Sequence, residues 1–164
     1  MKAICNSSPI IGLSILGRLD ILWKLFDIYI PKEVYDEIVN KGSNQSFGKM
    51  ELFNAVKSGQ IKVHKVKEKQ LVEKSYGRLH KGELEVIVGA KEIDAKIVII
   101  DDQSARNFAE DLNLKPIGLL GVLRLAKRKE IIHNIKPYIE LLVSHKIRIS
   151  QNIINQILEE VGEK

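Results

Sequence analysis

"KIVIIDDQSARNFAEDLNL", residues 96–114, is the stretch that decides the fold of this chain. Four apolar residues, Ile97 to Ile100, are followed directly by Asp101 and Asp102, and then by apolar residues at helical spacing. A short continuous apolar run is typical of a strand that is buried on both faces, as in a parallel sheet covered by helices. The stretch therefore predicts a buried strand that brings two carboxylates to its carboxyl end.

The same alternation of strand and helix runs along the whole chain. We expect further strands in four segments: "KAIC" (2–5), "DIYIP" (27–31), "IKVHKV" (61–66) and "LKPIG" (114–118). We expect helices over residues 9–26 with a break near Gly17, and over 32–41, 49–58, 82–93, 103–112, 118–130, 134–145 and 150–161, with a helix and a turn in the charged segment 67–82. Strands that alternate with helices predict an α/β fold with a mostly parallel sheet covered on both faces.

The length and composition fit one folded domain. The chain has 164 residues, of which 45% are hydrophobic and 29% charged, so we expect a single domain over 1–164. Its α/β core would cover about 3–130, with a helical C-terminal extension over about 131–164. A net charge of +5 is a weak indication of a polyanionic partner.

Other features of the composition exclude some classes of protein. The single cysteine, Cys5, excludes an internal disulfide and cysteine-clustered zinc sites. No apolar run approaches the ~20 residues that span a bilayer, and the N-terminus has no signal-peptide pattern. We therefore expect a cytoplasmic protein that does not bind membranes.

Several polar side chains are expected at strand ends and helix starts. Asn6 follows the first strand, Asp101 and Asp102 follow the strand at 97–100, Glu83 lies in a first helical turn, and Glu37 lies in the helix after the second strand. In open parallel sheets, ligands bind beyond the carboxyl ends of the strands. Carboxylates that gather there repel one another unless a cation compensates them, and oxygen-only sites suit Mg²⁺ or Mn²⁺.

Each acidic residue also has a simpler structural interpretation. Asp101 or Asp102 can cap the helix that follows, and Glu83 suits the first turn of its own helix. Glu37 is compatible with a solvated helix face. Glu85 cannot point to the same place as Glu83, because helical neighbours are three or four residues apart.

Motifs for other chemistries are missing from the sequence. It has no G-x-G-x-x-G after the first strand and no phosphate-binding G-x-x-x-x-G-K-[ST]. Its four histidines do not have metal-ligand spacing, and nothing places a serine with a histidine and an acid. A signalling receiver needs an acidic pair after the first strand, which "CNSSP" (5–9) does not supply.

Four stretches occur in the order found in PIN-like domains: "ICNSSPIIGLSILGRLDILWKLF" (4–26), "YIPKEVYDEIV" (29–39), "HKGELEVIVGAKEIDAKIVIIDDQSAR" (80–106) and "LNLKPIGLLGVLRLAKRKEII" (112–132). From about residue 3 to residue 160 the chain resembles this superfamily, which includes the VapC-type toxin nucleases. The resemblance is closest to a branch known only as a PIN-related domain of unknown function. It implies a three-layer α/β/α fold and an acidic pocket that binds Mg²⁺ or Mn²⁺ and hydrolyses RNA.

The resemblance also implies which residues form the site. By position, Asn6 occupies the first acidic place, Glu37 the second, Glu83 the third and Asp101 the fourth, with Asp102 as its neighbour or substitute. Glu37, Glu83 and Asp101 would be catalytic, and all five would hold the metal. The residues expected to support the site or engage RNA are Ser8, Glu85 and Arg106.

Asn6 is a departure from the family pattern, which most often has Asp there. An amide oxygen ligates a cation, but it removes one negative charge and cannot act as a base. Our first hypothesis is a metal-dependent endoribonuclease, which could be the toxin of a toxin–antitoxin pair with an antitoxin protein as partner. The alternative is a catalytically lapsed module that binds RNA or a protein.

The helices also suggest self-association. Trp23 and Phe26 lie three apart, and the last helix repeats apolar residues from Ile153 to Val161 at helical spacing. These side chains can instead simply cover the core. Because related PIN-like proteins commonly pair, we expect a homodimer built on helical surfaces.

Overall fold

The computed structural model describes residues 1–43, 45–75 and 79–163, with no account of the side chains of Glu73 and Ser75. Its centre is a five-stranded sheet with the strand order β3-β2-β1-β4-β5, in which every neighbouring pair is parallel. The strands are β1 (Lys2–Cys5), β2 (Asp27–Pro31), β3 (Ile61–His64), β4 (Ile97–Ile99) and β5 (Lys115–Ile117).

The strand order reverses beside β1, and this reversal creates the position for a site. The chain moves outward from β1 to β2 and β3, then returns to form β4 and β5 on the other side of β1. In the register of β1 and β4, Cys5 lies opposite Ile99, and the Asn6 N–H donates to the Ile99 carbonyl at 2.9 Å. The segments that leave these two strands therefore diverge, and open a crevice at the carboxyl edge of the sheet.

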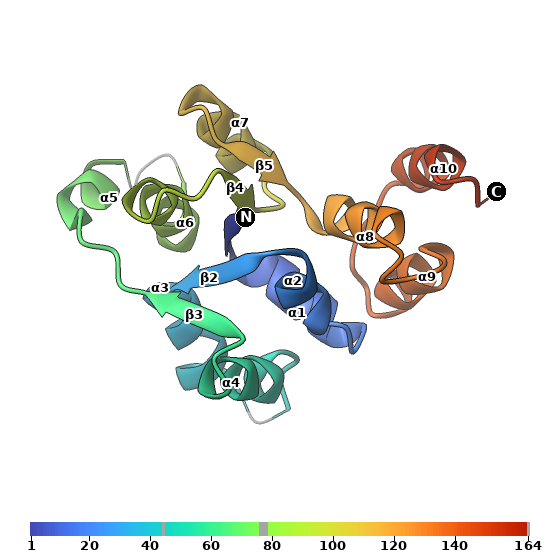
Figure 1. The fold of residues 1–164 in the computed structure, drawn as a ribbon, viewed down its shortest axis with the longest axis horizontal. Coiled ribbons are helices and arrows are strands. Elements are labelled where there is room, and N and C mark those ends of the chain that lie inside the picture. Colours follow the sequence, from blue (N-terminus) through green and yellow to red (C-terminus); the bar gives the residue numbers. More distant parts are fainter. Residues whose placement is uncertain (44, 76–78, 164) are drawn as a thin grey trace.

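Helices cover the sheet on both faces, so the fold has three layers (Figure 1). Crossovers between parallel strands are right-handed, so the reversal of strand order places the helices before β3 on one face and those between β3 and β5 on the other. The helices are α1 (Ser7–Ile15), α2 (Asp20–Leu25), α3 (Lys32–Tyr35), η1 (Asp36–Asn40), α4 (Lys49–Lys57), α5 (Lys69–Ser75), α6 (Lys81–Glu92), α7 (Gln103–Asp111), α8 (Leu119–Arg128), α9 (Lys136–Ser144) and α10 (Gln151–Glu160).

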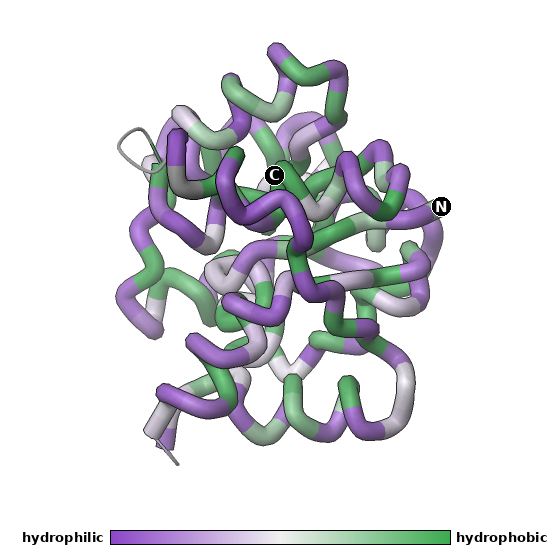
Figure 2. Tube along the Cα trace, turned by 90° about the vertical axis from the view of Figure 1, so that its left-hand side faces the viewer, coloured by the Kyte–Doolittle hydropathy of each residue, from purple (hydrophilic) through white to green (hydrophobic). Residues whose placement is uncertain are grey.

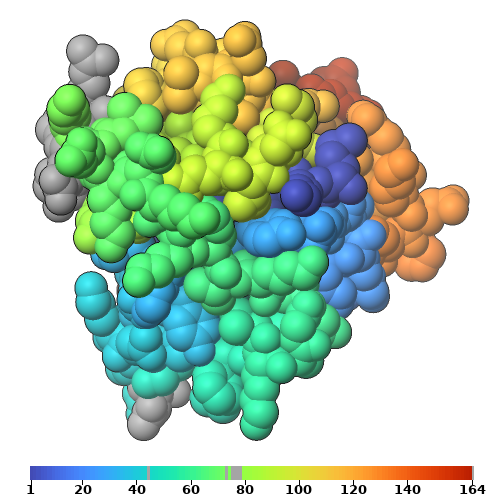
Figure 3. Space-filling model, turned by 60° about the vertical axis from the view of Figure 1, so that its left-hand side comes forward, coloured from blue at the N-terminus to red at the C-terminus, as the bar shows by residue number. Residues whose placement is uncertain are grey.

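The core lies between the sheet and these helices. Hydrophobic and hydrophilic segments alternate along the helical parts of the trace, as expected of helices with one buried face (Figure 2). The central strands are almost fully buried; Ile4, Val98 and Ile99 have 0% exposure. Helix α6 packs against β1, β2 and β4. In Figure 3, the residues of α4 lie at the bottom of the face toward the viewer and those of α5 and α6 at its top, while the red C-terminal residues lie behind at the upper right.

The C-terminal helices extend the layer formed by α1 and α2. Helix α8 contacts both α1 and α2, and α9 contacts α1. The end of the chain is held by Glu163, whose carboxylate accepts the Ile135 and Lys136 N–H groups and pairs with Lys127 at 2.7 Å. Burial of this carboxylate raises its pKa, but these hydrogen bonds outweigh that effect and lower it.

The structure differs from the sequence prediction in a few places. The helix expected over 32–41 is regular only in α3 and continues as the π-helix η1, although this segment contains no glycine or internal proline. The third strand ends at His64 rather than at residue 66. Of the turn expected before α6, residues 76–78 lie outside the described part. No helix among the described residues is long and apolar enough to cross a membrane.

Candidate active site at the carboxyl edge of the sheet

Asn6 begins the site at the end of β1. Its backbone is extended where α1 starts, but its side chain does not cap that helix. The residue is 8% exposed, so its amide is nearly enclosed. Because buried polar groups need partners, an Asn side chain not used for capping at this position is available for another role.

Glu37 reaches the same place from η1. A Cβ built on Gly82, in the first turn of α6, would lie 3.5 Å from Asn6 Oδ1 and 3.8 Å from Glu37 Oε2. The absent side chain of Gly82 thus leaves a space into which two oxygen atoms face. The π-helix sets the position of Glu37, and such local widening is frequent at functional sites.

Glu83 is the next residue of α6 and is 7% exposed. Its Oε1 accepts the His80 N–H at 3.1 Å, so the capping interpretation of this residue is correct. Burial raises the pKa of the Glu83 carboxyl, the His80 N–H opposes this, and the negative charge of Asp102 raises it further. Glu83 and the end of β4 therefore lie close enough to repel.

Asp101 and Asp102 differ in their contacts: one caps the following helix and the other does not. Asp102 caps α7, with its Oδ2 accepting the Ala105 N–H at 2.9 Å. Asp101 is held by two donors: Ser8 Oγ at 3.1 Å from Oδ2, and the Leu119 N–H at 2.8 Å from Oδ1. A Cβ on Gly118 would lie only 2.8 Å from Asp101 Oδ1, so glycine is needed for this approach. Asp101 is thus fixed against the starts of α1 and α8.

This geometry can be compared with known families. A family model described as a PIN domain matches residues 2–163, nearly the whole chain. The chain belongs to the PIN domain family. No curated protein matches it. PIN domains are nuclease-type domains that generally use divalent metals.

Glu85, expected to support the site, lies among charged groups of α3, α5 and α6. Burial raises the pKa of its carboxyl, and Glu33 raises it further, while Lys81 and Lys69 lower it. Its Oε2 is buried without a hydrogen-bond partner. Glu33 forms an ion pair with Lys81 at 3.5 Å. Glu85 therefore lies beside Glu33 and Lys81.

Arg106 lies on the other side of Asp101. The point where a Cβ on Gly118 would stand is 3.8 Å from Arg106 Nη1 as well as 2.8 Å from Asp101 Oδ1. Arg106 Nε is buried and has no hydrogen-bond partner. Both residues line a cavity of about 430 Å³ that extends between β5, α8 and α10.

The donors at this edge suit a hydrated cation better than a closed metal cage. In residues 1–43, 45–75 and 79–163, no group of three or more His, Cys, Asp or Glu side chains is arranged to hold a metal ion. Mg²⁺ commonly keeps several waters and uses only one or two carboxylates. The oxygen pair facing Gly82 and the repulsion at Glu83 both fit such an ion.

Sequence reasoning did not find the residues that shape the site without carrying charge. Gly82 leaves space between Asn6 and Glu37, and Gly118 allows Asp101 to reach the Leu119 N–H. Gly82 lies in the first turn of α6 directly before Glu83, and this neighbouring acid is a usable signal, whereas no acidic residue adjoins Gly118 in the sequence.

Proposed function

We propose that the protein is a metal-dependent endoribonuclease. The observation that carries the proposal is the unbalanced charge at the switch point of the sheet. Among the described residues, no ion pair joins a lysine or arginine to Glu37, Glu83, Asp101 or Asp102. Carboxylates gathered without a counter-charge favour a bound cation, and the PIN family supports a nuclease.

The residues have separate roles in this proposal. Asn6 Oδ1 and Glu37 Oε2 would hold Mg²⁺ or Mn²⁺ beside Gly82, with Glu83 and Asp101 acting directly or through water and Asp102 as their neighbour. Such a cation neutralises charge on the phosphodiester and acidifies water. Ser8 and the Leu119 N–H keep Asp101 oriented toward the site.

The reaction would be hydrolysis at phosphorus. The oxygen of water forms a bond to phosphorus in line with the 3′-oxygen, and the P–O3′ bond breaks. The proton lost by water balances the proton gained by the 3′-oxygen. The products carry a 5′-phosphate and a 3′-hydroxyl.

One observation favours a second candidate function, a lapsed PIN module that binds RNA or a protein. Asn6 is neutral where the family pattern usually has Asp, so the site has one negative charge fewer. Cation binding weakens as ligand charge falls. Cleavage activity of the purified protein separates the two candidates.

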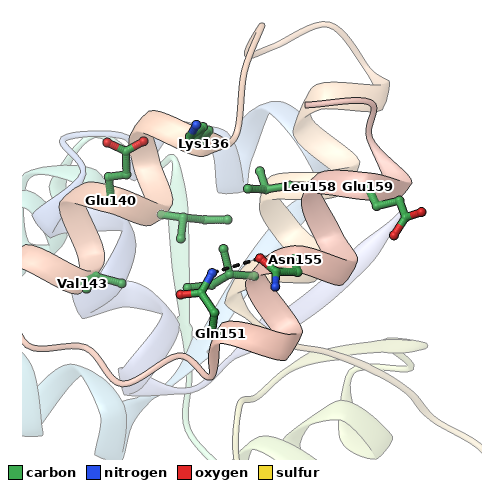
Figure 4. A pocket seen from close by; sticks show the side chains of 9 residues that line it. Lys136, Glu140, Val143, Gln151, Asn155, Leu158 and Glu159 are labelled. Atoms are coloured by element: carbon green, nitrogen blue, oxygen red, sulfur yellow. Dashed lines mark hydrogen bonds between the residues drawn. The ribbon is translucent and has the colours of Figure 1, made fainter. Parts of the chain in front are cut away.

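The role as the toxin of a toxin–antitoxin pair and the homodimer are part of the same proposal. A hollow of about 740 Å³ lies between α9 and α10, walled by apolar side chains that include Val143 and Leu158, with Gln151 and Asn155 hydrogen-bonded at its rim (Figure 4). Val143 is 46% exposed. A second copy docked on this hollow would cover Val143, whereas Phe26 and Ile157 are already buried in the core.

The direct test is incubation of purified protein with single-stranded RNA in Mn²⁺, Mg²⁺ or EDTA, followed by mass spectrometry of the products. We expect fragments with 5′-phosphate and 3′-hydroxyl ends in either metal, and intact RNA in EDTA. RNA that stays intact in both metals contradicts the nuclease and favours the lapsed module.

A further inference from the structure

Arg106 is a cation without a counter-ion, placed beside the acidic edge. Its Nε is buried without a partner, and it forms no ion pair with any residue that the structure describes. Asp101 lines the same cavity, but no hydrogen bond or ion pair joins it to Arg106 in the described part of the chain; its oxygens accept Ser8 Oγ and the Leu119 N–H. Because a guanidinium donor is stabilised by an acceptor, Arg106 is available to bind an anionic ligand.

The cavity that Arg106 lines has more positive than negative charge available. Arg124 is neutralised by Glu160 at 2.7 Å. Lys115, on β5, has no ion-pair partner in the described part of the chain. The cavity thus offers two unpaired cations, Arg106 and Lys115. Guanidinium groups bind phosphate through paired N–H donors, so a phosphate is the anion that fits best.

The rest of the cavity suits the remainder of a nucleotide. Ile117, Leu120, Ile153 and Ile157 provide apolar walls, and Gln156 adds an amide that can both donate and accept hydrogen bonds. A volume of about 430 Å³ lies in the range of small-molecule sites. Apolar walls beside one polar amide can contact a base with little dependence on its identity.

The position of Gly118 links this cavity to the proposed active site. The space that its missing Cβ leaves lies between Asp101 Oδ1 and Arg106 Nη1. A strand with one phosphate beside Asp101 can therefore place an adjacent nucleotide against Arg106. We propose that this cavity is a nucleotide subsite, in which Arg106 binds a phosphate next to the scissile one; the assignment of the strand as substrate rests on the proposed nuclease function.

Binding without cleavage tests the subsite. Fluorescence anisotropy with a labelled single-stranded RNA of about eight nucleotides, in EDTA, gives Kd for the wild type, Arg106→Gln and Arg128→Gln. Arg128 is exposed on α8 and does not line the cavity, so it controls for the lost charge. We expect Kd to rise about 10- to 100-fold for Arg106→Gln and about twofold or less for Arg128→Gln. Equal changes in the two variants, or no RNA binding by the wild type, overturn the subsite.

A second pair of variants avoids buried positions. Ile153→Glu adds a negative charge at the cavity wall, and Leu141→Glu adds the same charge on α9, where the residue is 38% exposed and away from the cavity. We expect only Ile153→Glu to weaken RNA binding, by about 10-fold. Unchanged binding by this variant overturns the subsite even if Arg106→Gln does not fold.

Competition identifies the ligand chemistry. A nucleoside 5′-monophosphate should displace the labelled RNA from the wild type at lower concentration than inorganic phosphate does, and the unphosphorylated nucleoside should not displace it. Displacement by the nucleoside that is as effective as displacement by the nucleotide contradicts the phosphate contact.

The failures of the two proposals are distinguishable. If RNA binds through Arg106 but is never cleaved in Mn²⁺, the subsite stands and the nuclease proposal is refuted. If the RNA is cleaved but Arg106→Gln changes neither Kd nor KM, the nuclease proposal stands and the subsite is refuted.

Discussion

Glu83 and Glu92 lie at opposite ends of the same helix, α6, and their surroundings treat the two carboxylates differently. Glu92 accepts His64 Nε2 at 2.7 Å and the Lys67 and Glu68 N–H groups at 3.0 and 2.8 Å. Burial raises its pKa, but these donors outweigh burial and lower it. In the described part of the chain, Glu83 has one hydrogen-bond donor, the His80 N–H, and its pKa is raised.

The helix dipole predicts the reverse order. A carboxylate is favoured in the first turn of a helix, where Glu83 lies, and disfavoured in the last turn, where Glu92 lies. Burial and the charge of Asp102 override the dipole at Glu83, while three donors override it at Glu92. Hydrogen bonds within the fold therefore stabilise the charged form of Glu92, whereas the charged form of Glu83 lacks a positive partner that a bound cation would provide.

The largest expected difference between the two residues is in RNA cleavage. Glu83→Gln keeps an oxygen for the His80 N–H but removes the charge, so we expect kcat/KM to fall about 100-fold or more. Glu92→Gln should stay within about twofold, because Glu92 lies at the other end of α6. Initial rates in Mn²⁺ measure both. Equal losses in the two variants would remove the distinction between the ends of the helix.

Stability should respond in the opposite way. Glu92→Gln loses charge-assisted hydrogen bonds, so we expect its free energy of unfolding to fall by about 1–3 kcal/mol. Glu83→Gln relieves repulsion by Asp102, so in EDTA it should be at least as stable as the wild type. Urea unfolding followed by circular dichroism gives both values. A Glu83→Gln protein less stable than Glu92→Gln would contradict the comparison.

The pH dependence sharpens the interpretation of Glu92. Its folded pKa is lowered from the ordinary value of 4.5, so its contribution to stability is present above that value and is lost as pH falls through the folded pKa. The difference in unfolding free energy between the wild type and Glu92→Gln should therefore be full near neutral pH and shrink in acid. A difference that is constant down to about pH 3 would mean that the charge of Glu92 is irrelevant.

The smallest expected effect is at Asn6. Asn6→Asp adds a negative charge beside Glu37 and should tighten Mn²⁺ binding by about tenfold, which corresponds to about 1.4 kcal/mol. Calorimetric titration compares the variant with the wild type. Unchanged affinity would mean that the Asn6 side chain does not face the cation.

The sequence was sufficient for the parts of this molecule that depend on local pattern. The apolar run from Ile97 to Ile100 predicted β4 and its buried position, and the alternation of elements predicted the parallel α/β sheet. These features depend on hydrophobic periodicity, which a single sequence records.

The sequence was insufficient where several segments meet. The widening of η1 has no local signal, because it depends on how residues 32–41 pack against the rest of the fold. The different surroundings of Glu83 and Glu85 depend on residues outside α6: Asp102 acts on Glu83, and Glu33 on α3 acts on Glu85. The sequence around Arg106 has no signal that its Nε is buried without a hydrogen-bond partner, because this depends on how α7 packs against β5.

Titration calorimetry with Mn²⁺ on the wild type, Glu83→Gln and Glu92→Gln tests most directly whether the carboxyl edge of the sheet binds a divalent cation. We predict that the wild type and Glu92→Gln bind Mn²⁺ with similar affinity, and that Glu83→Gln binds it about 10- to 100-fold more weakly. Affinity that is the same in all three proteins, or no Mn²⁺ binding by the wild type, would contradict the account.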